Sequence, residues 1–261
     1  MRKKVIAVTV LLLLAGSGVF CVYGRGISYP LLLRVTGTRT VADVLARYGP
    51  DARRRMAPHF RRAGVAYPPK QIALLVFKRE NRLAVWARSA LNEPWRFVRH
   101  YPILAASGHA GPKLRQGDHQ VPEGLYRIEH LNPMSSYHLS MKVSYPNEFD
   151  RRMAARDGRT RLGGDIFIHG NRVSIGCVAI GDPAIEELFT LVAETGHPRV
   201  KVIIAPNDLR AGGAIVHDEA PRWVGQLYRT VAAALAEFPL WMESDSAMDV
   251  RGMPKATKAF K

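Results

Sequence analysis

Short apolar runs separated by turn-forming residues follow one another from residue 71 to residue 205. The first two, at 72–77 and 83–86, flank the polar turn 78–81 and predict a β-hairpin. Glycine, proline and asparagine between the later runs favour further turns. Strands are also predicted near 95–98, 103–106, 125–128, 138–143, 166–169 and 200–204. This pattern predicts a mainly β body, sandwich-like or barrel-like.

Two segments have the helical spacing of apolar residues instead, and we expect both helices at the periphery of the β body. The first covers 183–195 and the second covers 221–238. Their apolar stripes are Ile185, Leu188, Phe189 and Val192 in the first and Trp223, Leu227, Val231 and Leu235 in the second. The tail at 244–261 is expected to fray.

The N-terminus begins with Arg2, Lys3 and Lys4, followed by an uncharged apolar run of 19 residues at 5–23. About 20 apolar helical residues span a bilayer core, and basic residues before them stay in the cytoplasm. Residues 1–24 are therefore predicted to be a signal anchor that holds the protein at the inner membrane with its body in the periplasm. A cleaved signal peptide is the alternative, and a buried helix of a soluble protein is a third interpretation.

Residues 25–69 are predicted to form a basic juxtamembrane linker with short helices. Helical spacing covers 41–48, Gly49-Pro50 is expected to end that helix, and a second helix is expected at 51–62. The arginines of the second helix face either solvent or anionic lipid headgroups. The remaining domains are predicted at 70–205, the β body, and at 206–261, a C-terminal helix and tail.

Composition and charge narrow the choice of partner. Hydrophobic residues make up 47% of the chain and charged residues 23%, which is typical of a globular protein. The formal net charge of +16 is concentrated at the N-terminus: residues 1–70 hold 13 Lys/Arg against 2 Asp/Glu, and 71–205 hold 18 against 13. A folded reader of nucleic acid needs a basic face on its body, so no nucleic-acid partner is expected.

The segment 165–182, DIFIHGNRVSIGCVAIGD, carries the candidate chemistry. Cys177 is a lone thiol of the predicted exported body, and His169 precedes it by eight residues across a short loop. A thiol needs a nearby base or cation to react as thiolate. Gly176 permits close approach of a substrate, and the amides of Gly176 and Cys177 can form an oxyanion hole. His138, His169 and Cys177 are potential zinc ligands, but no second cysteine or HxxxH spacing supports a metal, and none is expected.

In this segment, His169-Gly170 followed by Ser174-x-Gly176-Cys177 resembles the active-site signature of the L,D-transpeptidase catalytic (YkuD) domain family. Other pieces are similar to that family in the same order. They are the hairpin 72–86, the stretch 101–108, the turn Pro122–Tyr126, and, for the YafK-type subgroup, the short loop after His169 with the stretches 137–140 and 145–147. The resemblance covers roughly residues 70–205 and implies the mainly β fold of these catalytic domains, with a few peripheral α-helices.

The resemblance implies a thiol acyltransferase that acts on peptidoglycan stem peptides. It makes Cys177 the nucleophile and His169 the general base, with the Gly170 carbonyl orienting the imidazole. It assigns the oxyanion to the amides of Gly176 and Cys177, and gives Ser174 a role in the loop or in substrate contact. The predicted substrate-binding residues are His138, Asn171, Arg172 and Tyr145.

Two positions depart from the family pattern. Many members have histidine at the position of Ile175 and arginine at the position of Ala179. Arg172 or the arginines of 151–161, a stretch expected to be a mobile surface loop rather than a substrate lid, can supply charge instead. These departures affect the expected substrate more than the nucleophile.

The predicted function is a periplasmic cysteine acyltransferase that acts at diaminopimelate, by L,D-transpeptidation or by hydrolytic release of a wall-linked peptide or protein through the same thioester. Its partners are stem peptides, a wall-attached protein and, through the N-terminus, the inner membrane. No cofactor is expected. The alternative is a catalytically silent, membrane-tethered peptidoglycan-binding module.

Overall fold

The computed structural model describes residues 38–217 and 219–240. The apolar run at 5–23 and the tail at 244–261 lie outside these residues, so their predictions stay predictions. Within the described part of the chain, no helix combines the length and the apolar character needed to cross a membrane. The compact unit that contains the β body begins at Val41.

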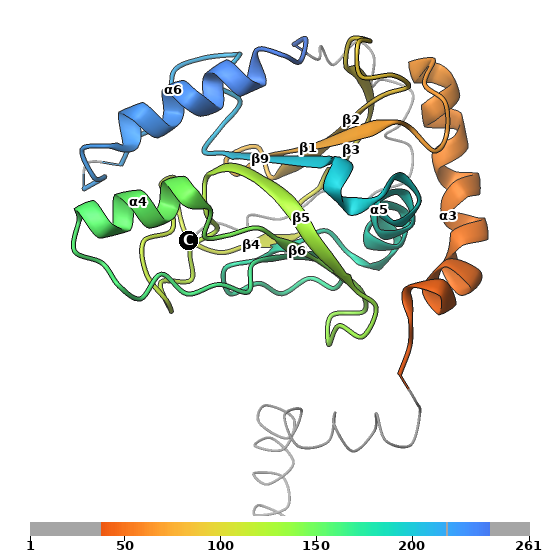
Figure 1. Cartoon of the computed structure of the whole chain (residues 1–261), viewed down its shortest axis with the longest axis horizontal. Helices are drawn as coiled ribbons and strands as arrows, with labels where there is room; N and C mark the ends of the chain where they lie inside the picture. The colour runs from red at the N-terminus through yellow and green to blue at the C-terminus, as the bar shows by residue number, and fades with distance from the viewer. Residues whose placement is uncertain (1–37, 218, 241–261) are drawn as a thin grey trace, which may run out of the picture. The chain divides into compact units, whose positions relative to one another are not determined.

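A curled sheet forms the centre of this unit, and its order in the described chain is β3-β2-β1-β9-β5-β6-β7-β8-β4 (Figure 1). The prediction of a mainly β fold is confirmed. The strands are β1 (Gln71–Phe77), β2 (Arg82–Arg88), β3 (Arg96–Pro102), β4 (Ala105–Ala106), β5 (Gly124–Asn132), β6 (Ser140–Val143), β7 (Phe167–His169), β8 (Val178–Ala179) and β9 (Val200–Ala205).

Helices cover the sheet from different sides, with α6 and α4 drawn on one side of Figure 1 and α3 and α5 on another. The two helices expected from periodicity are confirmed as α5 and α6. The helical elements are α3 (Val41–Ala63), α4 (Glu148–Arg156), α5 (Asp182–Thr195), the 3₁₀ turn η1 (His197–Arg199) and α6 (Val224–Leu235).

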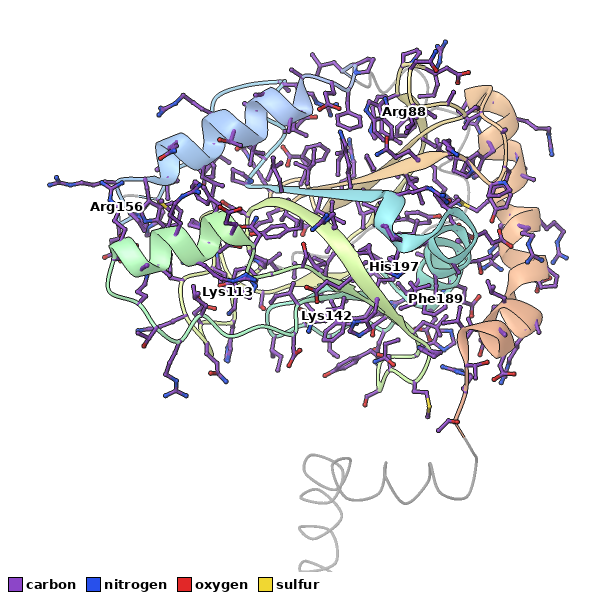
Figure 2. The ribbon with its side chains drawn as sticks, viewed as in Figure 1. Arg88, Lys113, Lys142, Arg156, Phe189 and His197 are labelled. Carbon is purple, nitrogen blue, oxygen red and sulfur yellow. The ribbon has the colours of Figure 1, made fainter. Side chains whose placement is uncertain are left out.

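Strand β1 is apolar without interruption because both of its faces are covered. Leu74 belongs to the core that contains Leu188 of α5, and its neighbour Leu75 belongs to a second core with Leu227 of α6. Successive strand residues point to opposite faces, so a strand between two layers loses the usual apolar–polar alternation. Phe189 of α5 lies inside the fold, whereas Arg156 lies at its edge (Figure 2).

Helix α3 is continuous, so the expectation that Gly49-Pro50 ends a first helix is wrong. A proline inside a helix costs about 3 kcal/mol because its nitrogen carries no hydrogen to donate. Burial offsets this cost: Val44, Met56 and Phe60 are nearly inaccessible, and each such side chain contributes about 1.5–3 kcal/mol. Packing against the body therefore overrides the local signal to break.

Two arginines of α3 pair with α5, an arrangement that neither expected alternative described. Arg53 lies 2.6 Å from Glu194. Arg55 lies 2.5 Å from Glu187 and 3.2 Å from Glu186. Part of the predicted linker is thus a structural element of the compact unit that contains the β body.

The expectation of a mobile loop at 151–161 is also corrected, because its first half is the end of α4. The helix begins with a capping box: Asn147 accepts from the Asp150 amide, and the Asp150 carboxylate accepts from the Asn147 amide, both at 2.9 Å. Beyond α4, Arg159 donates to the carbonyl of Leu114 at 2.8 Å. The capping box stabilises the start of α4, and the Arg159 contact joins the end of the stretch to the segment that contains Leu114.

We expect Asp150→Asn to flatten the dependence of stability on pH between about 4 and 6. Burial raises the pKa of Asp150 from 3.8 to about 6, although the Asn147 amide and the Tyr126 hydroxyl donate to it. The folded protein therefore keeps a proton that the unfolded chain has released. Its contribution, up to about 3 kcal/mol, is present below pH 4 and lost as the pH rises through 6.

Urea unfolding of both proteins at pH 4, 5, 6 and 7 tests this prediction. The difference in unfolding free energy between wild type and variant should change across that window. A constant difference would show that Asp150 titrates alike in both states.

Candidate active site

The parallel pairing of β7 with β8 brings the predicted nucleophile and base to one face of the sheet. Ile168 aligns with Val178, and His169 aligns with Ala179. Cys177 immediately precedes β8, two positions before Ala179, so strand alternation continued by one residue would turn its side chain to the face of His169.

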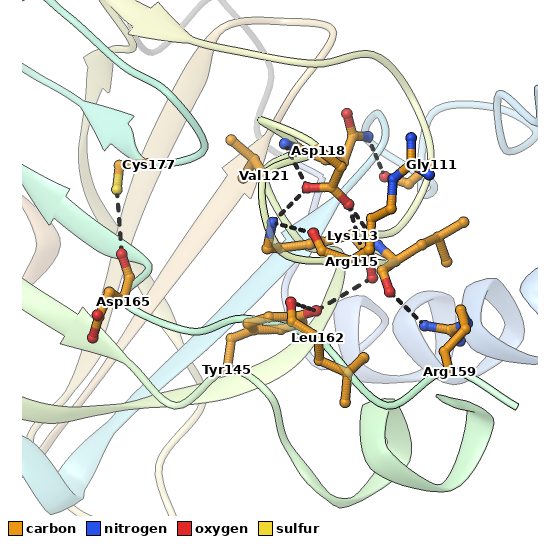
Figure 3. Close-up of polar contacts among 12 residues, drawn as sticks. Gly111, Lys113, Arg115, Asp118, Val121, Tyr145, Arg159, Leu162, Asp165 and Cys177 are labelled. Carbon is orange, nitrogen blue, oxygen red and sulfur yellow. Dashed lines mark hydrogen bonds and ion pairs between the residues drawn. The ribbon is translucent and has the colours of Figure 1, made fainter. Parts of the chain in front are cut away.

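The thiol and the imidazole are not hydrogen-bonded to each other in the described structure. The Cys177 thiol donates instead to the carbonyl oxygen of Asp165, with Sγ 3.6 Å away (Figure 3). Catalytic hydrogen bonds are often long or unformed without substrate. The shared face supports the predicted pair, and its direct hydrogen bond stays a prediction.

His169 is held in one tautomer by its neighbour. Its Nδ1 lies 2.6 Å from the carbonyl oxygen of Gly170, so Nδ1 carries the hydrogen and Nε2 is left to accept a proton. The ring also packs on Tyr137, with centroids 4.7 Å apart. A side chain at position 170 would meet Asp182 Oδ1 at 2.5 Å and the Tyr137 carbonyl at 2.7 Å, so only glycine fits there.

Burial keeps both reacting groups uncharged. It lowers the pKa of His169, against the hydrogen bond to Gly170 that raises it. Burial also raises the pKa of Cys177, and the charge of Asp165 adds to this; the backbone of Phe167 and the charge of Lys113 act in the opposite direction. Both shifts favour the uncharged forms, a thiol and a neutral imidazole, which general-base catalysis requires before the reaction.

Ser174 shapes the turn that presents the thiol. Its hydroxyl donates to the Cys177 carbonyl at 2.6 Å and accepts from the Cys177 amide at 3.0 Å. The Cys177 amide predicted for the oxyanion hole is thus already engaged. Gly176 has a φ of +113°, which favours glycine, and a Cβ there would lie 3.7 Å from the Gln120 carbonyl oxygen.

Two predicted substrate-binding residues have structural partners. His138 Nε2 lies 3.0 Å from Glu186 Oε1, and its ring packs edge-on against Tyr48. Tyr145 is buried, and its hydroxyl donates to the carbonyls of Lys113 and Leu162 at 3.4 and 3.3 Å. These contacts fit the structural role weighed for His138, while substrate contact by either residue stays untested.

The other two, Asn171 and Arg172, are exposed on the loop that joins β7 to Cys177. Asp182 Oδ1 accepts from the Asn171 amide at 2.7 Å, and Asn171 Oδ1 accepts from the Arg172 amide at 2.6 Å. The Arg172 side chain therefore starts from a backbone held by hydrogen bonds, on the loop between β7 and Cys177. Both positions remain available to a substrate.

The potential zinc ligands do not form a metal-binding group. Among residues 38–217 and 219–240, no cluster of three or more His, Cys, Asp or Glu side chains is arranged to hold an ion. The expectation of no metal stays a prediction.

Sequence reasoning missed the loop that contains Lys113 and Asp118. Lys113 is buried, and its Nζ lies 2.5 Å from Asp118 Oδ1 (Figure 3). The Asp118 carboxylate also accepts from the amides of Leu114, Arg115 and Gln120. The sequence signal for this pair is weak: a lysine five residues before an aspartate, in a stretch with several glycines. The fold, and not the local sequence, places the Lys113 charge where it lowers the pKa of Cys177.

Comparison with known sequences assigns the segment that contains these residues to a family. Residues 71–204 match the family described as L,D-transpeptidase catalytic domain (YkuD). The chain belongs to this family. Proteins named "Putative L,D-transpeptidase YafK" from Escherichia coli strains K12 and O157:H7 are each 34% identical over 140 residues. The match covers 52% of this chain and 54% of each relative, so the chain spans about half the length of these relatives.

Solved structures resemble the YkuD-family chain in part. The helical cell shape determining protein Pgp2 from Campylobacter jejuni is 22% identical with a TM-score of 0.43, covering 52% of this chain and 48% of its own. Bd1075 from Bdellovibrio bacteriovorus is 24% identical with a TM-score of 0.38 over the same shares.

We expect Lys113→Met to move the alkylation of Cys177 to higher pH. The buried ammonium favours the thiolate, so its removal raises the thiol pKa further. Asp118 keeps three amide donors in the variant, which preserves the loop. The measurement is the rate of iodoacetamide modification of the Cys177 peptide, by mass spectrometry, from pH 6 to 10.

Lys201→Met, on β9, is the control that removes a lysine without touching this loop. Equal pH profiles for the wild type and Lys113→Met would show that Lys113 has no influence on the thiol.

Proposed function

We propose that this YkuD-family protein is a periplasmic cysteine acyltransferase acting on peptidoglycan stem peptides next to diaminopimelate. The observation that carries the proposal is the placement of Cys177 and His169 on one face, with His169 Nε2 free of the Gly170 contact that occupies Nδ1. The family match supplies the class of reaction. Export rests on the basic and apolar pattern of residues 1–23.

In the first step, the thiol proton passes to His169 Nε2 as Sγ attacks the amide carbonyl carbon. Charge develops on the carbonyl oxygen, which the Gly176 amide can stabilise. The carbon–nitrogen bond then breaks, and the imidazolium returns the proton to the departing amine. A thioester on Cys177 remains, and the imidazole is neutral again, as its lowered pKa favours.

The second step decides between bond exchange and release. An amine that attacks the thioester forms a new amide, whereas water forms a carboxylate; both restore the thiol. We propose that hydrolysis or exchange of the thioester proceeds at least as readily as crosslinking. Val173 and Ile175 are 52% and 73% exposed, and Ala179 stands in place of a charged contact, so little protein shields the thioester from water.

Cys177→Ala is expected to abolish conversion of muropeptides while leaving the melting temperature nearly unchanged. The sulfur is irreplaceable in the covalent step, and loss of one small, half-buried side chain changes few contacts. Purified muropeptides incubated with the full-length protein are analysed by mass spectrometry. Cys21→Ser is the matched control and should retain wild-type rates.

Full conversion by Cys177→Ala would contradict the covalent mechanism. A wild-type protein that binds muropeptides but neither makes nor breaks a bond would favour the silent binding module.

The route of the second step is measured in heavy-oxygen water with a tetrapeptide muropeptide and, separately, with a wall-linked peptide. We expect heavy oxygen in the new carboxylate, because water reaches the thioester. Dimers that accumulate without heavy oxygen in any product would show a dedicated transpeptidase instead.

A further inference from the structure

The carboxylate of Glu123 is fully buried and receives hydrogen bonds from three separate parts of the chain. Lys78 Nζ, at the end of β1, lies 3.0 Å from Oε1, and the Gly111 amide donates to the same oxygen at 2.8 Å. The hydroxyl of Tyr228, on α6, donates to Oε2 at 2.7 Å. A buried carboxylate is tolerable only when donors of this kind replace its water.

These bonds fix the segment 108–123, called here the Lys113 loop. Lys78 also donates to the carbonyls of Gly111 and Val121, each at 3.0 Å, and so ties the two arms of the loop together. The Gln120 side-chain amide donates to the carbonyls of His109 and Gly111, both at 2.6 Å. The loop is therefore held from β1 and α6 rather than by its own short contacts alone.

The Lys113 loop borders the candidate nucleophile. The Gln120 carbonyl oxygen lies 3.7 Å from the point where a Cβ of Gly176 would stand, and the His119 carbonyl carbon lies 3.8 Å from it. Lys113, on the same loop, carries the charge that opposes the burial of Cys177. Movement of the loop would alter both the backbone that packs on Gly176 and the field at the thiol.

We propose that Tyr228 is a positioning residue for the Cys177 site, acting through Glu123 and the Lys113 loop. Helix α6 lies outside residues 71–204, so this assigns part of the active-site architecture to a helix beyond the family domain. The inference rests on the proposed function in taking Cys177 as the reacting thiol. Without the hydroxyl, Glu123 Oε2 loses its donor, and the carboxylate with its attached loop relaxes toward another partner.

Tyr228→Phe tests the proposal against a closely matched control, Tyr101→Phe. Tyr101 is also buried, and its hydroxyl donates to a buried glutamate, Glu187, at the same distance of 2.7 Å. That carboxylate pairs with Arg55 of α3 and Arg99 of β3, and within the described residues no hydrogen bond or ion pair joins it to the Lys113 loop. The two variants remove the same atom from similar surroundings on different sides of the sheet.

The full-length proteins are compared in melting temperature, in the pH profile of Cys177 alkylation and in muropeptide turnover. The charged groups that act on the thiol are Lys113 and Asp165. His169, on the neighbouring strand β7, is the titratable group expected to face it. We expect Tyr228→Phe to shift the alkylation profile to higher pH and to lower kcat by about threefold or more, the usual scale for a residue coupled through packed neighbours. Tyr101→Phe should lower the melting temperature comparably and leave both readouts unchanged.

A second arm combines Tyr228→Phe with Lys113→Met. If the loop transmits the effect, the double variant should alkylate with the profile of Lys113→Met alone. Equal profiles for wild type and Tyr228→Phe, or equal shifts in both tyrosine variants, would overturn the proposal. Alkylation needs no turnover, so a wild type that converts no muropeptide while Tyr228→Phe still shifts the profile would refute the proposed function and leave the positioning role standing.

Discussion

The register between two very short strands is the constraint on which the candidate site depends. Because β7 and β8 are aligned with His169 beside Ala179, Cys177 emerges on the face of the imidazole. A slip of one residue would turn the thiol to the opposite face. Strands of three and two residues form few hydrogen bonds of their own, and two further bonds hold this register. The Ile180 amide, one residue beyond β8, donates to the His169 carbonyl at 3.0 Å, and the Leu104 amide donates to the Ala179 carbonyl at 2.8 Å.

The same burial that fixes the site sets its chemistry. Burial of the two side chains disfavours the thiolate–imidazolium pair, because charge is solvated poorly where side chains replace part of the water. His169 and Cys177 accordingly both shift toward their neutral forms. Lys113 offsets part of this cost for the thiolate, and its own burial is tolerated through Asp118. The reactivity of the thiol is thus a balance between a scaffold that desolvates it and a loop that supplies one positive charge.

Much of the fold could be predicted from sequence, and the centre of the candidate site could be proposed from it, because these signals are local. The apolar runs of β1 and β9 and the stripe of α5 reflect burial that each segment carries in its own residues. His169 and Cys177 lie close in sequence, so a short motif reveals them. The sequence wrongly predicts a break of helix α3 at Pro50, because the contacts that compensate for the proline are distant in sequence. Arg55, for example, bonds to Glu187, 132 residues away. Lys113 was missed for the same reason: its effect on Cys177 depends on a chain path that no local pattern encodes.

The helices that flank the family domain supply hydrogen-bond partners that are distant in sequence from the groups they contact. The Lys113 loop contains a buried carboxylate and a buried ammonium, and such groups must find partners wherever the fold provides them. Glu123 finds one in Tyr228 on α6, and Glu187 of α5 finds one in Arg55 on α3. Both partners lie outside residues 71–204. Two carboxylates buried by the catalytic domain, Glu123 and Glu187, therefore draw one of their partners from its extensions, which makes α3 and α6 structural parts of this unit rather than appendages to it.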